Sequence, residues 1–183
     1  MSNFDEAFVK VVGIEGRFSD NPNDSGGATM YGITEAVARA YGYMGRMQDM
    51  PLGIAKEIYQ LRYWNKLQLD KVASIAGARV ADELFDTGVN QGTVAAGTYL
   101  QRSLNALNQR ASLYADIATD GDVGPMTIAA LRAYVARRGV QGTTVLLRAL
   151  NALQGAFYIG LTEARSKDED FLYGWLLNRV TIA

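Results

Sequence analysis

The chain contains neither cysteine nor histidine among its 183 residues. The lack of cysteine excludes disulfides and thiol nucleophiles, and the lack of histidine excludes Ser-His-Asp and Cys-His catalysis and nearly every zinc site. Acid–base chemistry must therefore depend on Asp, Glu, Lys or Tyr side chains. No metal ion or organic cofactor is predicted.

Long apolar runs and an excess of basic charge are missing as well. No stretch approaches the ~20 apolar residues that span a membrane. The acidic start, M-S-N-F-D-E-A-F, lacks the basic and apolar regions of a secretory signal. The formal net charge is −1 and the pI is about 5.5, which gives no electrostatic case for nucleic acid. We therefore expect a protein that neither binds nucleic acid nor inserts stably into a membrane.

Hydrophobic residues make up 49% of the chain and charged residues 20%, as is ordinary for a globular protein. Apolar residues recur at helical spacing over most of the sequence. The pattern predicts an all-α fold, with a short β-hairpin or irregular loop at about 17–33. Thr34 and Thr93 are predicted to cap helices. Helices are expected at about 3–16, 34–42, 51–64, 69–89 with a break near Gly77, 93–107, 125–139, 143–166 and after Asp168.

Glu15 lies at the end of the first predicted helix, in phase with Phe4, Phe8 and Val11. At ~100° per residue these side chains point into one narrow sector, so Glu15 is expected on the buried face of its helix. Partial burial and the negative end of the helix dipole both disfavour an ionised carboxyl, as a general acid requires. A Glu that is salt-bridged to an Arg, or exposed by fraying, fits the same pattern equally well.

The loop after Glu15, rich in Gly, Asn, Asp and Pro, contains candidates for a second catalytic carboxylate. Glycoside cleavage usually needs a protonated acid beside the glycosidic oxygen and a carboxylate that stabilises positive charge or handles water. Asp24 can supply this carboxylate, and Thr29 can hydrogen-bond a water or fix the loop. Asp20 is equally eligible, and either Asp also fits an ordinary turn residue. The acids of this loop and of the D-G-D-V-G-P run fail the EF-hand pattern, so no metal site is predicted.

The stretch from Glu15 to Thr34 resembles the signature of the glycoside hydrolase family 108 muramidases, which include phage endolysins and relatives once called secretion activators. That signature reads approximately E-G-G-Y-x-x-x-P-x-D-x-G-G-x-T-x-Y-G-I-T. The matching residues here are Glu15-Gly16-Arg17-Phe18, Pro22, Asp24, Gly26-Gly27, Thr29 and Tyr31-Gly32-Ile33-Thr34. Arg17 and Phe18 replace the usual Gly-Tyr, so the hydroxyl of that Tyr is lost.

The likeness extends over roughly residues 5–165. Beyond the signature, the matching residues are Tyr63-Trp64, the D-x-x-x-N-x-G element of Asp86, Asn90 and Gly92, Leu100-Gln101, and the D-G-D-V-G-P run of Asp120 to Pro125. The last two resemble the C-terminal region called a predicted peptidoglycan-binding domain. We therefore expect a hydrolase region at 1–92 and a helical, peptidoglycan-binding-like region at 93–183, packed as one body.

The resemblance implies hydrolysis of the β-1,4 bond from N-acetylmuramic acid to N-acetylglucosamine in peptidoglycan, on a lysozyme-like α bundle. The family's catalytic Glu corresponds to Glu15. Asp24 and Thr29 resemble the Asp and Thr that phage-type lysozymes pair with their Glu. The spacing from Glu15 to Asp24 is the same as theirs, whereas the spacing from Asp24 to Thr29 is one residue shorter.

Around these residues, the candidate sugar contacts are Tyr31, Tyr63, Trp64, Asn90 and Gln91. Aromatic faces pack on the C–H surfaces of sugars, and Asn and Gln can bond N-acetyl groups. Tyr63 and Trp64 also fit core aromatics, and Asn90 also fits a helix cap.

Two other functions stay open: a lytic transglycosylase that releases anhydro products, and a non-catalytic wall-binding or secretion accessory protein. Through the resemblance, we expect a monomeric phage or prophage endolysin whose partners are bacterial peptidoglycan glycan strands. Such an enzyme would wait in the host cytoplasm until another factor opens the membrane, and would then act on the periplasmic cell wall.

Overall fold

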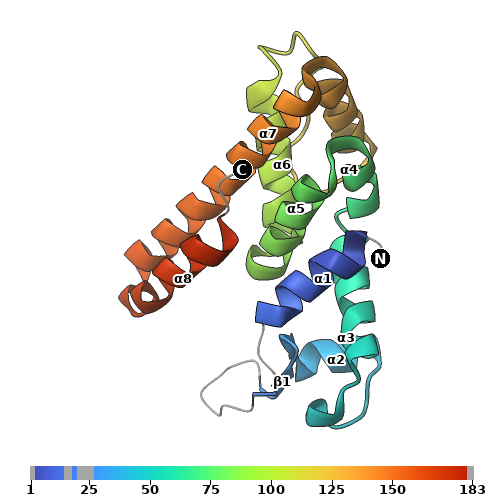
Figure 1. Ribbon diagram of the computed structural model, residues 1–183, viewed down its shortest axis with the longest axis vertical. Coiled ribbons are helices and arrows are strands. Elements are labelled where there is room, and N and C mark those ends of the chain that lie inside the picture. The colour runs from blue at the N-terminus through green and yellow to red at the C-terminus, as the bar shows by residue number, and fades with distance from the viewer. Residues whose placement is uncertain (1–2, 15–17, 20–26, 181–183) are drawn as a thin grey trace. The chain divides into compact units, whose positions relative to one another are not determined.

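The computed structural model describes residues 3–14, 18–19 and 27–180. The chain divides into two compact units, Met1–Asn65 and Lys66–Ala183. Apart from one small two-stranded sheet, the regular structure of the described residues is helical (Figure 1). The predicted all-α fold with a short hairpin near the front is therefore confirmed.

The first unit is built from short elements. They are α1 (Asn3–Ile14), β1 (Thr29–Met30), β2 (Ile33–Thr34), α2 (Glu35–Tyr41), the 3₁₀ turn η1 (Met47–Asp49), α3 (Leu52–Tyr59) and the π-helical turn η2 (Gln60–Trp64). The two strands pair antiparallel. The hairpin thus overlaps the end of the stretch, at about 17–33, in which the sequence predicts a hairpin or loop.

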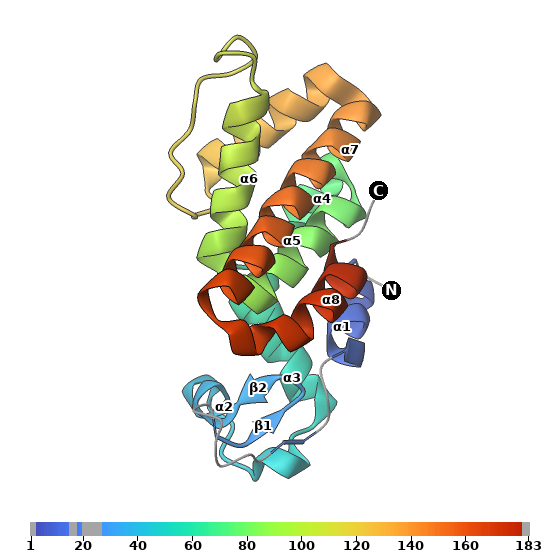
Figure 2. The same ribbon diagram turned by 90° about the vertical axis from the view of Figure 1, so that its left-hand side faces the viewer.

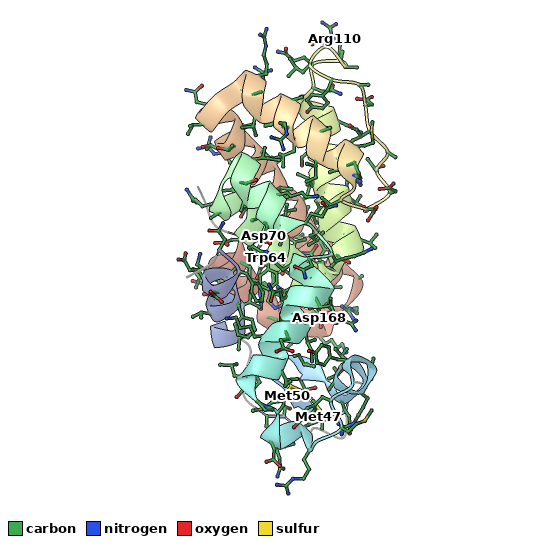
Figure 3. All side chains as sticks on the ribbon, turned by 90° about the vertical axis from the view of Figure 1, so that its right-hand side faces the viewer. Met47, Met50, Trp64, Asp70, Arg110 and Asp168 are labelled. Atoms are coloured by element: carbon green, nitrogen blue, oxygen red, sulfur yellow. The ribbon has the colours of Figure 1, made fainter. Side chains whose placement is uncertain are left out.

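The core of this unit gathers where α1 faces α3 and η2. Phe4, Phe8 and Val11 are buried, as their helical phase predicts. The ring of Phe4 lies 5.4 Å from that of Trp64 and 5.8 Å from that of Phe8. Figure 3 labels Trp64 together with two further buried side chains of the unit, Met47 and Met50.

The ends of the short helices follow local signals. Thr34 caps α2 as predicted, because its hydroxyl accepts a hydrogen bond from the backbone N–H of Val37 at 3.4 Å. Gly42 ends the helix in the left-handed conformation, at φ 105°. The predicted helix at 51–64 changes geometry at Gln60, where Asn65 N–H donates to Gln60 O at 2.8 Å. This bond spans five residues and marks a π-helical turn, a form common at functional sites.

The second unit is a bundle of longer helices. They are α4 (Leu69–Ala76), α5 (Ala78–Gln91), α6 (Thr93–Leu107), α7 (Pro125–Ala164), the 3₁₀ turn η3 (Ser166–Asp168) and α8 (Glu169–Arg179). The predicted break at Gly77 is confirmed, with φ 90° at that residue. The predicted cap at Thr93 is wrong: Gly92 takes the cap position at φ 93°, and no side chain caps α6. Glycine there permits the sharp turn between α5 and α6.

The longest helix, α7, contains both of the helices predicted at 125–139 and 143–166. It bends at Gly139, whose φ of 57° and ψ of −150° are not helical, and Figure 2 shows the resulting change of direction. By length and composition, α7 is the one helix of the described residues that could cross a membrane. Leu131, Leu146 and Leu150 of this helix are buried in the bundle, as is usual for a core helix.

Gly97 of α6 sits against the backbone of Gly121, and this contact generates a prediction. A Cβ at Gly97 would lie 2.1 Å from the carbonyl oxygen of Gly121. We expect Gly97→Ala to lower the free energy of unfolding by about 2 kcal/mol, because the backbone must shift. Gly160→Ala is the control, since its Cβ would enter open space, and it should stabilise α7 by about 0.5 kcal/mol. Urea unfolding measures both, and equal effects would contradict this account of the packing.

Candidate functional site

The predicted catalytic carboxylates, Glu15 and Asp24, lie outside the described residues, as does the alternative Asp20. Their roles therefore stay predictions. On one side of them the described chain reaches Ile14, the last residue of α1. On the other side it resumes at Gly27, just before β1. The described residues that flank the candidate site in the sequence therefore belong to α1 and to the segment that leads into β1.

Tyr31 and Gly32 form the tip of the β1–β2 hairpin. Their φ values are 52° and 73°, and Met30 pairs with Ile33 on either side of them. Two central residues with positive φ make a type I′ turn, in which Asn, Asp or Gly is the usual first residue. A tyrosine in this left-handed conformation costs about 1 kcal/mol, which its surroundings must offset. Such strain is typical of functional sites.

Thr29 lies at the start of the same hairpin. It pairs with Thr34 and also bridges Ser19 through two backbone hydrogen bonds of 2.8 and 2.9 Å. Its hydroxyl donates to the carbonyl oxygen of Gly27 at 3.2 Å. The Thr29 hydroxyl therefore stabilises the backbone conformation of the residues immediately before β1.

Tyr59 connects α1, the hairpin and η2, and it is not among the candidate residues that the sequence suggests. Its side chain is 2% exposed, and its hydroxyl donates to the carbonyl oxygen of Tyr31 at 3.0 Å. Its ring centroid lies 5.5 Å from that of Phe8 on α1 and 5.5 Å from that of Tyr63. Tyr59 thus joins α1, the hairpin tip and η2. The one signal in the sequence that could have identified Tyr59 is its place among apolar positions. A Tyr that is buried there usually needs a hydrogen-bond partner for its hydroxyl.

Tyr63 and Trp64, predicted as a pair, have different surroundings. Tyr63 is half-buried beside Tyr59. Trp64 is 0% exposed and packs against Phe4. Its ring therefore belongs to the core and offers no face to a sugar.

Asn90 and Gln91 lie at the carboxyl end of α5, in the second unit. Asn90 is exposed, and its Nδ2 donates to the backbone oxygen of Asp86 at 2.8 Å and to Asp86 Oδ1 at 3.1 Å. Gln91 Oε1 accepts from the hydroxyl of Tyr99 at 3.0 Å, while its Nε2 is buried without a partner among the described residues. Of the two side chains, that of Asn90 is the more exposed.

A seam of polar side chains runs between α5 and α7. Gln154 Nε2 donates to Asp86 Oδ2 at 2.7 Å and to the hydroxyl of Thr87 at 3.2 Å. One turn earlier on both helices Glu83 faces Asn151, and one turn later Gln91 faces Tyr158. The pairs advance in the same direction on both helices, so α5 and the second half of α7 run parallel along this seam.

Glu83 is the buried acid of the seam, with 6% of its surface exposed. Burial raises its pKa to about 8, the negative charge of Asp86 acts in the same direction, and the contact with Asn151 opposes them. Glu83 Oε1 and Asn151 Oδ1 are both buried acceptors without a partner among the described residues. A proton on Glu83 supplies the donor that these two acceptors lack.

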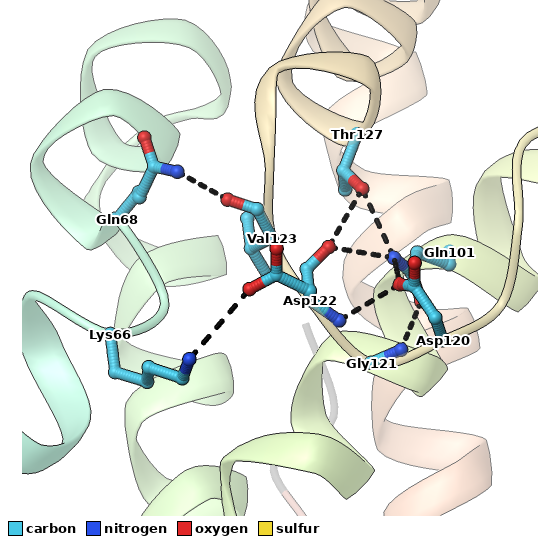
Figure 4. A network of polar contacts seen from close by, with 8 residues as sticks. All are labelled: Lys66, Gln68, Gln101, Asp120, Gly121, Asp122, Val123 and Thr127. Carbon is cyan, nitrogen blue, oxygen red and sulfur yellow. Dashed lines mark hydrogen bonds and ion pairs between the residues drawn. The ribbon is translucent and has the colours of Figure 1, made fainter.

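Figure 4 shows the contacts of the D-G-D-V-G-P run, several of which are made by the buried amide of Gln101, while Gln68 Nε2 donates to Val123 O. Gln101 Nε2 donates to Asp120 Oδ1 at 2.8 Å and to Asp122 O at 2.9 Å, and Gln101 Oε1 accepts from Gly121 N–H at 2.8 Å. The hydrogen bond from Gln101 lowers the pKa of Asp120. α7 then begins at Pro125. These polar groups hold the turn that leads into α7.

Comparison with known proteins matches the earlier and the later part of the chain to two different families. Residues 8–92 match the family Glycosyl hydrolase 108, and residues 95–180 match the family Predicted Peptidoglycan domain. Among solved structures, SagA of Brucella abortus is 26% identical with a TM-score of 0.70, covering 97% of this chain and 88% of that one. No curated protein matches the chain. The families meet between residues 92 and 95, whereas the compact units meet at Asn65 and Lys66.

The hydrogen bond from Tyr59 to the hairpin generates a second prediction. Tyr59→Phe keeps the ring contacts but removes the donor to Tyr31 O, so we expect the free energy of unfolding to fall by about 1 kcal/mol. Denaturant unfolding followed by Trp fluorescence reports on the change, since Trp64 lies in the same core. Tyr43→Phe is the control, because its hydroxyl bonds Arg46 O at 3.1 Å at an exposed position. An equal loss in the two variants would show that the Tyr59 bond has no special weight.

The buried Glu83 generates a third prediction. Its folded-state pKa of about 8 exceeds the ordinary Glu value of 4.5, so the folded protein binds more protons than the unfolded chain between these two pH values. The stability that the neutral carboxyl contributes is complete below the unfolded pKa and is lost as the pH rises through 8. Thermal unfolding at pH 5, 7 and 9 should show this loss, on the order of a few kcal/mol.

Glu83→Gln keeps the shape of the side chain and removes the titration, so its stability should change less over the same pH range. The exposed Glu163 of α7 provides the control, and Glu163→Gln should follow the wild type. Parallel pH profiles for Glu83→Gln and the wild type would refute the burial of a protonated carboxyl here.

Proposed function

Because this chain belongs to glycosyl hydrolase family 108, with a predicted peptidoglycan domain after its hydrolase region, we propose that it cleaves the β-1,4 bond between N-acetylmuramic acid and N-acetylglucosamine by general acid catalysis. The family makes the protein a glycoside hydrolase of lysozyme type that acts on peptidoglycan. The bond cleaved, the residues responsible and the biological setting belong to the proposal.

In the proposed mechanism Glu15 is the general acid. It gives its proton to the glycosidic oxygen as the bond to the anomeric carbon breaks, which leaves an oxocarbenium-like sugar. Asp24 stabilises that positive charge or positions the attacking water, and Thr29 assists by fixing the loop. The water then supplies the hydroxyl of the new reducing end, and its second proton is returned to a carboxylate of the site.

The observation that carries this proposal is the agreement between the family match and the local structure. The matched region, residues 8–92, contains the motif from Glu15 to Thr34. Ahead of that motif, α1 buries Phe4, Phe8 and Val11. Glu15 follows directly after this helix in the sequence, and its spacing from these three residues predicts that it shares their buried face. That position favours the protonated form of a carboxyl.

Four residues are proposed to bind the sugar chain. Tyr31 at the hairpin tip and Tyr63 beside Tyr59 are half-buried, so part of each side chain remains open to a ligand. Asn90 and Gln91 supply amide groups at the end of α5, with Asn90 the more exposed of the two. Trp64 is not included, because its side chain is fully buried.

We further propose that the protein is a monomeric phage endolysin, released from the host cytoplasm to the cell wall when another factor opens the membrane. The support for this setting is the resemblance of its motif to those of phage endolysins.

The test of the proposed function is Glu15→Gln, which keeps the size of the side chain and removes the transferable proton. We expect clearance of a suspension of purified peptidoglycan to fall by at least about 100-fold, with an unchanged circular dichroism spectrum. Glu6→Gln, also on the N-terminal helix but exposed, should retain full activity. Undiminished clearance by a normally folded Glu15→Gln variant would overturn the proposal.

A further inference from the structure

The orientation of the Asn90 amide is determined by Asp86. We infer that Asp86 is a positioning residue that turns Asn90 so that its carboxamide oxygen accepts a hydrogen bond from an N–H or O–H group of the bound glycan. This inference rests on the proposed function, because it takes Asn90 as a contact of the sugar chain. It adds a direction to that contact and a residue that sets the direction.

The geometry leaves one assignment of the amide. The Asn90 nitrogen lies 2.8 Å from the backbone oxygen of Asp86 and 3.1 Å from Asp86 Oδ1. Both neighbours are acceptors, so the group that faces them must be the NH₂ of the amide. The amide oxygen then points away, and it accepts no hydrogen bond from any described residue. Asn90 is exposed, so this oxygen is available to a ligand.

Asp86 can set this orientation because it is itself fixed from two other helices. Arg179 Nη1 of α8 donates to Asp86 Oδ1 at 2.8 Å, and Gln154 Nε2 of α7 donates to Oδ2 at 2.7 Å. The Arg179 side chain is 10% exposed and that of Asp86 is 18% exposed. A charge-assisted bond in such surroundings is stronger and more directional than an exposed ion pair. The carboxylate therefore has little freedom to turn.

This arrangement determines which sugar groups Asn90 can recognise. Both sugars of peptidoglycan carry N-acetyl groups, whose amide N–H is a donor, and ring hydroxyls that can donate as well. A fixed acceptor selects these groups and disfavours the carbonyl and carboxylate oxygens of the stem peptides, which would meet another acceptor. The same contacts connect the two regions of the chain that match different families. Arg179, within residues 95–180, holds Asp86, which lies within residues 8–92.

A double-mutant cycle tests whether Asp86 acts through Asn90. We would measure KM and kcat on solubilised peptidoglycan strands for Asp86→Asn, Asn90→Ala and the combination. Each single change should raise KM about 5-fold, the value of one hydrogen bond, with little change in kcat. The combination should be no worse than Asn90→Ala alone, because the residue through which Asp86 acts is already gone. The inference would be refuted if the fold-increases in KM of the two single variants multiplied in the double variant. A change confined to kcat would also refute it.

A second pair of variants covers the case in which Asp86→Asn fails to fold. Arg179→Met removes one of the bonds that fix Asp86, and should raise KM in the wild type but not in the Asn90→Ala background. Arg165→Met is its matched control: it removes an ion pair with Asp168 at the start of the α8 segment, which does not touch Asp86. Arg165→Met should leave KM unchanged. Equal effects of the two substitutions would show that loosening α8, and not the orientation of Asn90, changes KM.

Binding measured without turnover separates this inference from the proposed function. In the Glu15→Gln background, calorimetry with a tetrasaccharide of alternating N-acetylglucosamine and N-acetylmuramic acid should give the same non-additive pattern in Kd. Absence of hydrolysis by the wild type, with this pattern intact, would defeat the proposed function alone. Unchanged Kd in Asn90→Ala would defeat the inference, whatever the hydrolytic activity.

Discussion

The hydrogen bond from the Tyr59 hydroxyl to the carbonyl of Tyr31 is the constraint on which the first unit depends. It crosses 28 positions of sequence and holds the tip of a hairpin whose left-handed tyrosine is unfavourable by itself. The same ring packs on Phe8 of α1. One buried residue therefore relates the helix that precedes Glu15 to the strand that carries Thr29. Thr29, the proposed helper, depends on these elements for its position, although it lies far from Tyr59 in the sequence.

The second unit uses a different device, a polar seam inside a helical bundle. Buried polar groups are costly unless they are paired. Gln154 of α7 meets part of this cost by donating to Asp86 and Thr87 of α5. Asp86 is held by Gln154 and Arg179, while Glu83 avoids a buried charge by remaining protonated near neutral pH. The seam thus keeps the end of α5 in one register, and Asn90 stands at that end. Rigidity of this kind favours a fixed direction for a sugar contact.

Much of the fold could be predicted, because it depends on local signals. Helical phase predicts the buried face of α1. Gly77 predicts where α4 ends, and Thr34 predicts where α2 begins. The π-helical turn from Gln60 to Trp64 could not be predicted, since the apolar spacing contains no signal for it. At the site, the motif identifies Thr29, Tyr31 and Asn90 as candidates. It does not identify Tyr59 or the pairing of Asp86 with Arg179, which lie 28 and 93 positions from their partners. Such contacts leave no periodicity to detect.

The central claim is that this protein hydrolyses the glycan strand at the N-acetylmuramic acid residue. Mass spectrometry of the fragments released from purified peptidoglycan, before and after borohydride reduction, tests it most directly. Hydrolysis incorporates one water and leaves N-acetylmuramic acid as the new reducing end. The account predicts that every released glycan fragment ends in a reducible N-acetylmuramic acid. Anhydro fragments lighter by one water, fragments ending in N-acetylglucosamine, or no release of fragments would each contradict it.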